Sequence, residues 1–564
     1  MGLNENDPGV PNVDWISNLR TNPGDFMTQS HLHRRSNRTF LIHFASLMVL
    51  SNCGSFASSQ TTPVAAKNKV SPATMPRIGT VDPRFQSYNV EMVEVIGGRF
   101  WKPYGSKTVA TNTNSATPGG IDPSLFEQRP PIDLANARLR KLATALGPVY
   151  IRVSGTWANT VFYQDSDAPA PAAPPEGFGG VLTRAEWKGV LDFSKAVNAE
   201  IVTSFATGGG TRDANGLWTP AEASKFVNAT HAMGGKIAAA EFMNEPTFVS
   251  AAGVPKGYDG ASYGRDYAVF QPFFRKAAPE AILLGPGSVG EGIDLAGGAM
   301  KLLPSTELLA AMGPNAVDAF SYHFYGGVSS RCGGAMGSAG TTTPGAALGD
   351  EWLDRTNVVE AFYAKLRDQY APGKPMWVTE TGQTACGGDV WASTFLDSFR
   401  YLNQLGALAQ KAVQVVAHNT LAASDYALLD SHTFSPRPNY WSALLWHRLM
   451  GTTVLDPALP TAASVHTYAH CLHGVPGGVA LLVINANDKS PYTLTLPQPS
   501  DRYSLSSRDV ASGEVELNGK VLDLGPGDSL PRLNGIRTPA GEAVVAPASI
   551  TFFGFRGANN IACK

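Results

Sequence analysis

The chain has 564 residues, a formal net charge of −2 and a globular composition rich in Gly and Pro. This length predicts two or more domains, one of which can be a large α/β barrel. The balanced charge, without a long run of Lys or Arg, argues against a nucleic-acid-binding protein. The five cysteines form no C-x-x-C pair, which argues against a zinc or redox motif, and no apolar run reaches the length of a membrane span.

The N-terminal residues 1–70 are expected to be an export signal followed by a disordered segment. A basic stretch at 32–38 precedes an apolar stretch at 40–50 that has the length of a signal-peptide core, and small residues follow it. The pattern starts late, so Met27 is a plausible true start. "LSNC", ending at Cys53, loosely resembles a bacterial lipoprotein cleavage box. We expect a secreted or periplasmic protein, leave a lipid anchor at Cys53 open, and consider a short buried helix the alternative.

From residue 85 onward, strand and helix patterns alternate eight times. Each apolar, β-branched run is followed by a segment with apolar residues at helical spacing. Eight strand–helix units predict a (β/α)8 TIM barrel over residues 85–450. The expected strands are 85–95, 149–155, 200–206, 236–243, 281–287, 317–324, 375–380 and 412–418, and the expected helices are 133–146, 184–197, 220–235, 267–279, 305–313, 357–370, 393–406 and 441–451.

After about residue 453 the pattern changes to short strands separated by turn signals, with no helix pattern between them. This predicts a C-terminal β-sandwich domain over residues 453–564, to which residues 72–84 could add a strand. The Gly-rich stretch 326–349 is expected to be a flexible loop on the catalytic face. It lacks the Walker pattern of a phosphate-binding loop.

Two glutamates stand at the ends of expected strands. "AAAEFMNEP" brings Glu245 to the end of the fourth strand, and "KPMWVTETG" brings Glu380 to the end of the seventh. Either one alone is more simply explained as a strand end in a turn or in solvent. Together they could face each other across the C-terminal mouth of a barrel, and such paired carboxylates suit glycoside hydrolysis. Strand six neighbours strand seven, so the Tyr325 hydroxyl could reach Glu380 and keep it ionised; His323 and Tyr325 could also be ordinary core or rim aromatic residues.

"FMNEP" and "WVTETG" resemble the large clan of retaining barrel glycosidases. "RLRKLATALGPVYIRVSGTWAN", "SDYALLD", "NYWSALLWHRLMGTTVL" and the terminal "FFGFRGANNIACK" narrow the resemblance to glycoside hydrolase family 79, the heparanase and β-glucuronidase group, in its bacterial type. The likeness runs from about residue 85 to residue 564. It implies a retaining glycoside hydrolase, a heparanase-like (endo) β-glucuronidase, that cleaves β-linked glucuronic acid residues in an oligosaccharide or polysaccharide. The alternative is an exo-acting β-glucuronidase or another retaining β-glycosidase on plant or microbial glycans. We expect a monomer that needs no cofactor.

The resemblance also implies roles for individual residues. Glu245 matches the acid/base and Glu380 the nucleophile of the family. The matched substrate-binding residues are Asn244 for the 2-hydroxyl, Tyr325 on the nucleophile, Gly387, Gly388 and Tyr426 for the uronate carboxylate, Glu91 and Thr156 for further glucuronate contacts, and His323 on the same face.

Glu291 departs from the family pattern because it stands where an amide is often found. A third carboxylate near a uronate would repel it unless that carboxylate is protonated or paired, so the role of Glu291 stays open. The resemblance further implies a Cys471–Cys563 disulfide within the β-sandwich. Cys332 and Cys386 follow strands six and seven, and their pairing is left open.

Other protein classes fit less well. A non-catalytic sugar-binding barrel would normally have lost one glutamate. A zinc hydrolase needs a ligand cluster such as H-E-x-x-H, and a serine hydrolase needs a strained G-x-S-x-G turn; we expect neither, and no metal site. Between endo and exo action the sequence does not decide: Arg99, Lys102 and Lys107 could bind a sulfated polyanion or lie in a solvated loop, and the 326–349 loop could instead close the cleft.

Overall fold

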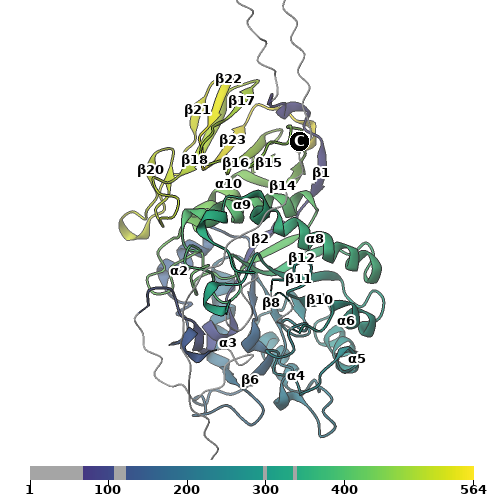
Figure 1. The fold of residues 1–564 in the computed structure, drawn as a ribbon. Coiled ribbons are helices and arrows are strands. Elements are labelled where there is room, and N and C mark those ends of the chain that lie inside the picture. Colours follow the sequence, from purple (N-terminus) through teal and green to yellow (C-terminus); the bar gives the residue numbers. More distant parts are fainter. Residues whose placement is uncertain (1–67, 107–121, 296, 298–300, 334–339) are drawn as a thin grey trace, which may run out of the picture. The chain divides into compact units, whose positions relative to one another are not determined.

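Residues 65–564 form one compact unit of the chain. The expected export signal, the lipid anchor at Cys53 and the side chain of Lys107 lie outside the described residues, so these expectations stay predictions. None of the helices in the described part of the chain combines the length and the apolar character that a bilayer span requires. The computed structural model describes residues 68–106, 122–295, 297, 301–333 and 340–564 (Figure 1).

Eight parallel strands form a closed barrel, in which the last strand pairs with the first (Figure 1). This confirms the predicted (β/α)8 architecture. The β-branched and apolar residues of these runs fill the barrel and its contacts with the surrounding helices, as parallel strands covered on both faces require. The strands are β2 (Gln86–Asn89), β5 (Val149–Val153), β8 (Ala199–Ser204), β9 (Ala239–Glu241), β10 (Ile282–Ser288), β11 (Ala319–Tyr325), β12 (Met376–Gly382) and β13 (Val415–His418).

A helix follows each barrel strand, as the apolar periodicity predicts. Side-chain caps fix where several of them begin; for example, Thr183 accepts from the Glu186 N–H, and the Glu186 carboxylate accepts from the Thr183 N–H in return. The helices are α2 (Ala137–Thr144), α3 (Arg184–Ala196), α4 (Ala221–Ala232), α5 (Gly260–Ala277), α6 (Ser305–Met312), α8 (Asp350–Tyr370), α9 (Phe395–Gln410) and α10 (Pro438–Leu449).

Two predicted boundaries are wrong. The first strand ends at Asn89 and not at Val95, because residues 92–96 form the short helix α1 (Met92–Ile96). The Glu91 N–H donates to the Glu94 carboxylate at 2.8 Å, and this local bond favours a helical turn over a strand. The last helix ends at Leu449, where the chain changes directly into a strand over β14 (Met450–Leu455). Residues 451–454 are Gly-Thr-Thr-Val, and β-branched residues favour a strand.

The expected absence of a G-x-S-x-G motif also needs correction. Residues 260–264, Gly-Ala-Ser-Tyr-Gly, do match the spelling G-x-S-x-G. They form the first turn of α5, and Asp259 accepts from both the N–H and the hydroxyl of Ser262 as the helix cap. A capped helix start is not the strained strand-to-helix turn that exposes a nucleophilic serine.

The C-terminal residues form a nine-stranded sheet and a separate two-stranded sheet. The expected strand from the N-terminal side of the barrel is present, since β1 pairs with β14 in the larger sheet. The larger sheet contains β1 (Arg77–Thr80), β14, β15 (Val465–Leu472), β16 (Val479–Asn485), β18 (Ser500–Ser506), β19 (Glu516–Leu517), β20 (Lys520–Val521), β21 (Ile536–Thr538) and β23 (Ser549–Phe555); the smaller sheet contains β17 (Tyr492–Leu496) and β22 (Gly541–Val545). Two further strand pairs are β3 (Gly98–Trp101) with β4 (Phe126–Arg129) and β6 (Val161–Gln164) with β7 (Gly180–Thr183).

Both faces of the larger sheet are buried at β16, which explains why this strand is apolar along most of its length. Leu481 and Val483 face the β17–β22 pair, whereas Leu482 and Ile484 belong to the core shared with the barrel helices. Alternate residues of a strand point to opposite faces, so β16 contributes to both cores. The two packed sheets match the expected β-sandwich. A division into two domains near residue 453 stays a prediction.

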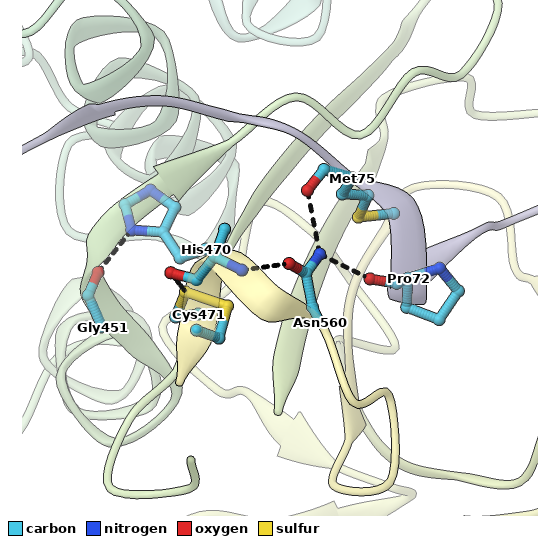
Figure 2. The surroundings of a disulfide bond; sticks show 8 residues. Pro72, Met75, Gly451, His470, Cys471 and Asn560 are labelled. Atoms are coloured by element: carbon cyan, nitrogen blue, oxygen red, sulfur yellow. Dashed lines mark hydrogen bonds between the residues drawn. A yellow bond between two sulfur atoms is a disulfide. The ribbon is translucent and has the colours of Figure 1, made fainter. Parts of the chain in front are cut away.

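The C-terminus is fastened to the sheet by a disulfide and by one asparagine (Figure 2). Cys471 of β15 is bonded to Cys563. The Asn560 side chain donates to the carbonyl oxygens of Pro72 and Met75, at 2.8 and 2.9 Å (Figure 2). These bonds hold both ends of the described chain close to the same sheet.

Candidate active site

A cavity of about 1240 Å³, including the space at its open mouth, lies at the C-terminal ends of the barrel strands. Barrel enzymes carry out their chemistry at this face. Asn244, Gly387 and Gly388 are not among the residues that line the cavity. The sequence-predicted residues that do line it are Glu91, Thr156, Glu245, Glu291, His323, Tyr325, Glu380 and Tyr426.

Glu245 and Glu380 face each other in this cavity. A carboxylate oxygen of Glu245 and one of Glu380 lie within 4.8 Å of each other. Glycosidases that retain anomeric configuration hold their two carboxyl groups about 5–5.5 Å apart, whereas inverting enzymes separate them by about 6.5–9.5 Å to admit a water. The observed separation therefore fits the retaining geometry.

The Glu380 carboxylate receives a hydrogen bond on each oxygen. The Tyr325 hydroxyl donates to Oε1 at 2.7 Å, and Arg152 Nη1 donates to Oε2 at 2.8 Å. Glu380 is only 5 % exposed, so these donors replace the water that would otherwise solvate it. Two donors, one of them a cation, hold the carboxylate in place for attack on the substrate, as a nucleophile requires.

The surroundings of the Glu245 carboxyl group differ from those of Glu380. Burial and the neighbouring Glu380 carboxylate raise the pKa of Glu245, which favours the protonated form that a general acid requires. Its backbone has φ +49°, in the left-handed region that non-glycine residues rarely adopt. That conformation lets the chain turn sharply at the end of β9 and aim the carboxyl group into the cavity.

Arg152 is the main residue that sequence reasoning missed. It lies inside β5, and its guanidinium binds Glu241 at 2.8 Å and Asn244 Oδ1 at 2.7 Å in addition to Glu380. Glu241 is fully buried and also accepts from the Thr379 hydroxyl at 2.6 Å. Burial opposes its charge, but Arg152 holds the pKa of Glu241 well below its usual range. A charged residue within the apolar run "VYIRV" was the available signal, because such residues are buried only when paired.

His323 lies among three carboxylates. Its Nδ1 is 3.1 Å from Glu245 Oε1, and its distances to Glu380 Oε2 and Glu241 Oε2 are 3.8 Å each. Burial and Arg152 oppose a charge on the ring, but the carboxylates outweigh them and raise the pKa of His323 to about 9. We therefore assign a cationic imidazole, and we interpret the 3.2 Å approach of Arg152 Nη2 to His323 Nε2 as a contact between two donors held together by Glu241.

Asn419, at the end of β13, is a second residue that the sequence did not single out. Its Nδ2 lies 3.0 Å from Glu91 Oε1, 2.9 Å from the Tyr325 hydroxyl and 3.1 Å from the Tyr426 hydroxyl. An amide has two N–H groups, so Nδ2 serves at most two of these three acceptors well at one time. Burial and the neighbouring Glu380 carboxylate raise the pKa of Glu91 well above its usual value. A polar cluster thus lines the part of the cavity near β2 and β13.

Glycine is required beside Glu91. A Cβ at Gly155, whose φ is +91°, would lie 1.5 Å from Glu91 Oε2. The Glu91 carboxyl group therefore lies directly on the backbone at the end of β5.

The glycine pair after β12 has only part of the expected role. Both residues have left-handed backbones, with φ +82° at Gly387 and +88° at Gly388. The Gly388 N–H donates to the Thr384 carbonyl at 3.2 Å, so it is already used within the loop. This corrects the expectation that both N–H groups bind a substrate carboxylate. A Cys332–Cys386 disulfide joins this loop to the one that follows β11.

Glu291 and Asn244 turn out to support the site. Glu291 accepts from the Ser305 N–H at 3.0 Å and from the Ser305 hydroxyl, so it caps the start of α6. Burial raises the pKa of Glu291, and the two Ser305 donors oppose this rise; a third carboxyl group is therefore tolerated beside the cavity because it is hydrogen-bonded. Asn244 is 1 % exposed, and its Oδ1 accepts from Arg152. In the absence of substrate, Asn244 therefore helps to orient Arg152.

Three side chains of the cavity lie close enough together to be compared with a metal site. Glu245, His323 and Glu380 bring one ligand atom each within 4.8 Å of the others. Arg152 and the cationic His323 already neutralise these carboxylates, and a metal ion would have to compete with both charges. The residues therefore do not suit a resident metal ion.

Comparison with known proteins places the chain in a family. The family description "Glycosyl hydrolase family 79, N-terminal domain" matches residues 130–406. Heparanase-like protein 1 of Arabidopsis thaliana is 30% identical over 380 residues, 65% of this chain and 67% of that protein. Baicalin-beta-D-glucuronidase of Scutellaria baicalensis is 36% identical over 186 residues, 31% of this chain and 35% of that protein.

Among solved structures, a 4-O-alpha-L-rhamnosyl-beta-D-glucuronidase from Fusarium oxysporum superposes with a TM-score of 0.58 and 14% identity, covering 86% of this chain and 99% of that one. At that identity the likeness shows the fold alone. Both protein relatives are from plants and give no support to the bacterial type expected from the sequence. With these matches along the barrel, the chain belongs to glycosyl hydrolase family 79 and is a glycoside hydrolase.

Proposed function

We propose that this glycoside hydrolase removes β-linked glucuronic acid with retention of configuration, with Glu380 as nucleophile and Glu245 as acid/base. The observation that carries the proposal is the carboxyl pair within 4.8 Å. One member of the pair receives two donors, and burial raises the pKa of the other. The glucuronidase named among the relatives supports the choice of glucuronides.

In the first step, a Glu380 oxygen attacks the anomeric carbon and the glycosidic C–O bond breaks. The Glu245 proton passes to the departing oxygen, and a covalent glycosyl–enzyme forms. In the second step, Glu245 takes a proton from water, the water oxygen bonds to the anomeric carbon and Glu380 is released. Glu245 is anionic between the two steps, and the adjacent His323 cation, 3.1 Å away, stabilises it there.

The Glu380 charge is quenched as the covalent bond forms. Arg152 then remains paired with Glu241, so its charge is not left isolated in the interior. The Tyr325 hydroxyl donates to Oε1 and fixes the orientation of the carboxylate before attack. These two residues position the nucleophile.

The substrate carboxylate is proposed to bind at the polar part of the cavity, near β2 and β13. The Tyr426 hydroxyl, which lines the cavity, is the donor we assign to it. Both Glu91 and Glu380 would repel a uronate if ionised. Burial and Glu380 raise the pKa of Glu91, which keeps it neutral at acidic pH and reduces this repulsion.

Export is part of the same proposal. Disulfides persist in oxidising compartments, and the chain has two of them, Cys332–Cys386 and Cys471–Cys563. We propose that the enzyme acts as an exported monomer.

The test follows the anomeric configuration of the first product by proton NMR. Hydrolysis of methyl β-D-glucuronide should release the β-anomer before mutarotation. Initial release of the α-anomer would overturn the retaining assignment. Faster hydrolysis of methyl β-D-glucoside than of the glucuronide would favour another retaining β-glycosidase instead.

A further inference from the structure

Apolar side chains cover the side of the cavity that holds Glu245. All of them line the cavity and are half-buried. Partly exposed apolar groups gathered in one concave place mark a binding surface, whereas single ones scattered over a surface do not. We call this surface the apolar wall; it consists of Phe248, Ala251, Val289, Ile293, Leu295 and Leu302.

The apolar wall lies across the barrel mouth from the polar cluster. Its residues follow β9 and β10, whereas Glu91, Thr156 and Asn419 follow β2, β5 and β13. In the closed order of strands, β11 and β12 separate these groups on one side and β8 separates them on the other. The general acid must contact the leaving oxygen. A leaving group beside Glu245 therefore meets the apolar wall, while the sugar meets the polar cluster and the aromatic side chains of Phe100, Trp101 and Trp157, which also line the cavity.

The apolar wall is a fixed part of the fold. The Thr247 hydroxyl donates to the Val289 carbonyl at 2.9 Å, and the Leu303 N–H donates to the Thr247 carbonyl at 2.8 Å. The cap that Glu291 provides to Ser305 ties the same segments together. Three stretches of chain are thus joined beside Glu245, so ligand binding need not order them first.

Among the described residues, no Lys or Arg side chain lines this cavity. Arg99 and Lys102, the candidates from the sequence, are not among the described lining residues, and Lys301 next to Leu302 is exposed outside the lining. Lys107 is the one basic residue in the internal segments 107–121, 296, 298–300 and 334–339. The carboxyl groups among the described lining residues are those of Glu91, Glu245, Glu291, Asp294 and Glu380, and the imidazole of His323 lies beside the catalytic pair.

The apolar wall opposes an anionic leaving group. A sulfated or uronate-bearing sugar chain would place charged groups on apolar side chains. An uncharged apolar group would be desolvated favourably there.

We propose that the leaving group of this enzyme is an uncharged, apolar alcohol or phenol, held by the apolar wall, and that one terminal glucuronate is removed from it. The proposal rests on the proposed glucuronidase function. It assigns exo action to the chain, a question on which the sequence left both alternatives open.

The test uses methyl, hexyl and octyl β-D-glucuronides, whose leaving groups have similar acidity and differ in apolar length. Each buried methylene is worth about fourfold in affinity, so kcat/KM should rise at least about tenfold from methyl to hexyl. Heparan sulfate oligosaccharides should be poorer substrates than hexyl glucuronide. Hydrolysis of methyl glucuronide without a rise along the series, or a preference for the sulfated chain, would overturn the apolar wall and leave the glucuronidase intact. Failure to hydrolyse any glucuronide would overturn both.

A variant pair links the effect to the surface. Leu302→Lys should reduce the hexyl-to-methyl ratio of kcat/KM by about tenfold. Val358→Lys is the matched control, because Val358 is 51% exposed and does not line the cavity; it should leave the ratio unchanged. Phe248→Ala provides a second test if Leu302→Lys does not fold. Equal ratios in the wild type and both wall variants would refute the assignment.

Discussion

Arg152 Nη1 lies 2.8 Å from Glu380 Oε2, so a cation from the interior of β5 holds the candidate nucleophile of β12. The same guanidinium binds Glu241 through Nη2 at 2.8 Å. One buried cation is therefore shared by two buried carboxylates, and it couples the stability of the barrel to the geometry of the active site.

Replacement of Arg152 should affect both properties. Arg152→Lys keeps the charge but cannot donate to both carboxylates from a planar fork, so kcat/KM should fall about 10²–10³-fold and stability about 1–3 kcal/mol. Thermal unfolding and steady-state kinetics on methyl β-D-glucuronide measure the two effects. Arg184→Lys, at a half-exposed pair with Asp165, serves as control and should stay within about 0.5 kcal/mol. Identical behaviour of the two variants would contradict the role of Arg152.

The two catalytic glutamates should respond differently to the leaving group. Glu245→Ala should lose at least about 100-fold on methyl glucuronide but much less on 2,4-dinitrophenyl glucuronide, because an acidic leaving group needs little protonation. Glu380→Ala should be inactive on both substrates. Azide should restore turnover of Glu245→Ala on the activated substrate and give the β-glucuronyl azide. If both variants respond alike, the roles of the two residues are misassigned.

The Tyr426 hydroxyl should determine the preference for a uronate. A hydrogen bond to a charged group is worth about 1.5–3 kcal/mol, so Tyr426→Phe should reduce the preference for glucuronide over glucoside by about 10- to 150-fold. The measurement is the ratio of kcat/KM on the methyl β-glucuronide and β-glucoside. Tyr503→Phe, on β18 of the sandwich, is a control of the same chemistry. An unchanged ratio in Tyr426→Phe would show that this hydroxyl does not bind the carboxylate.

Activity should decline as pH rises. Glu245 must hold a proton to act as acid, and burial with the Glu380 charge raises its pKa, so kcat is retained at low pH and is lost as pH rises through that raised value. Glu91 also ionises as pH rises and then repels the uronate, so KM should increase. In Glu91→Gln the rise of KM should disappear while the loss of kcat remains. A pH-dependent KM that persists in this variant would exclude Glu91 as its cause.

Acid should destabilise the fold through His470 of β15. Burial lowers the pKa of His470 to about 4 in the folded protein. In the unfolded chain His470 binds a proton at about pH 6.5, whereas in the folded chain it does so only at lower pH. The stability is present above pH 6.5 and is lost as pH falls from about 6.5 to about 4, by up to about 3 kcal/mol.

His470→Asn should flatten this part of the unfolding temperature profile, since Asn Nδ2 can replace the His470 Nδ1–H that bonds to the Gly451 carbonyl (Figure 2). His231→Asn, at an exposed position of α4, is the control and should leave the profile unchanged. Parallel profiles for the wild type and His470→Asn would refute the contribution of His470.

The sequence by itself determined the architecture and the pair of glutamates. Strand and helix periodicities are local properties, and eight alternations leave few arrangements other than a closed parallel barrel. Because the C-terminal ends of parallel strands meet at one rim, the positions of Glu245 and Glu380 at strand ends were enough to place them together. The boundaries near residues 89 and 450 were missed, since side-chain caps and β-branched residues there outweighed the periodic pattern.

Only the tertiary structure decided what surrounds the glutamates. Arg152 and Asn419 lie far from them in sequence, and closure of the barrel brings their side chains into contact with Glu380 and Tyr325. Likewise, Glu291 is a helix cap because α6 begins beside it. The polar cluster and the apolar wall arise where loops from different strands converge, and no local pattern in the chain encodes that convergence.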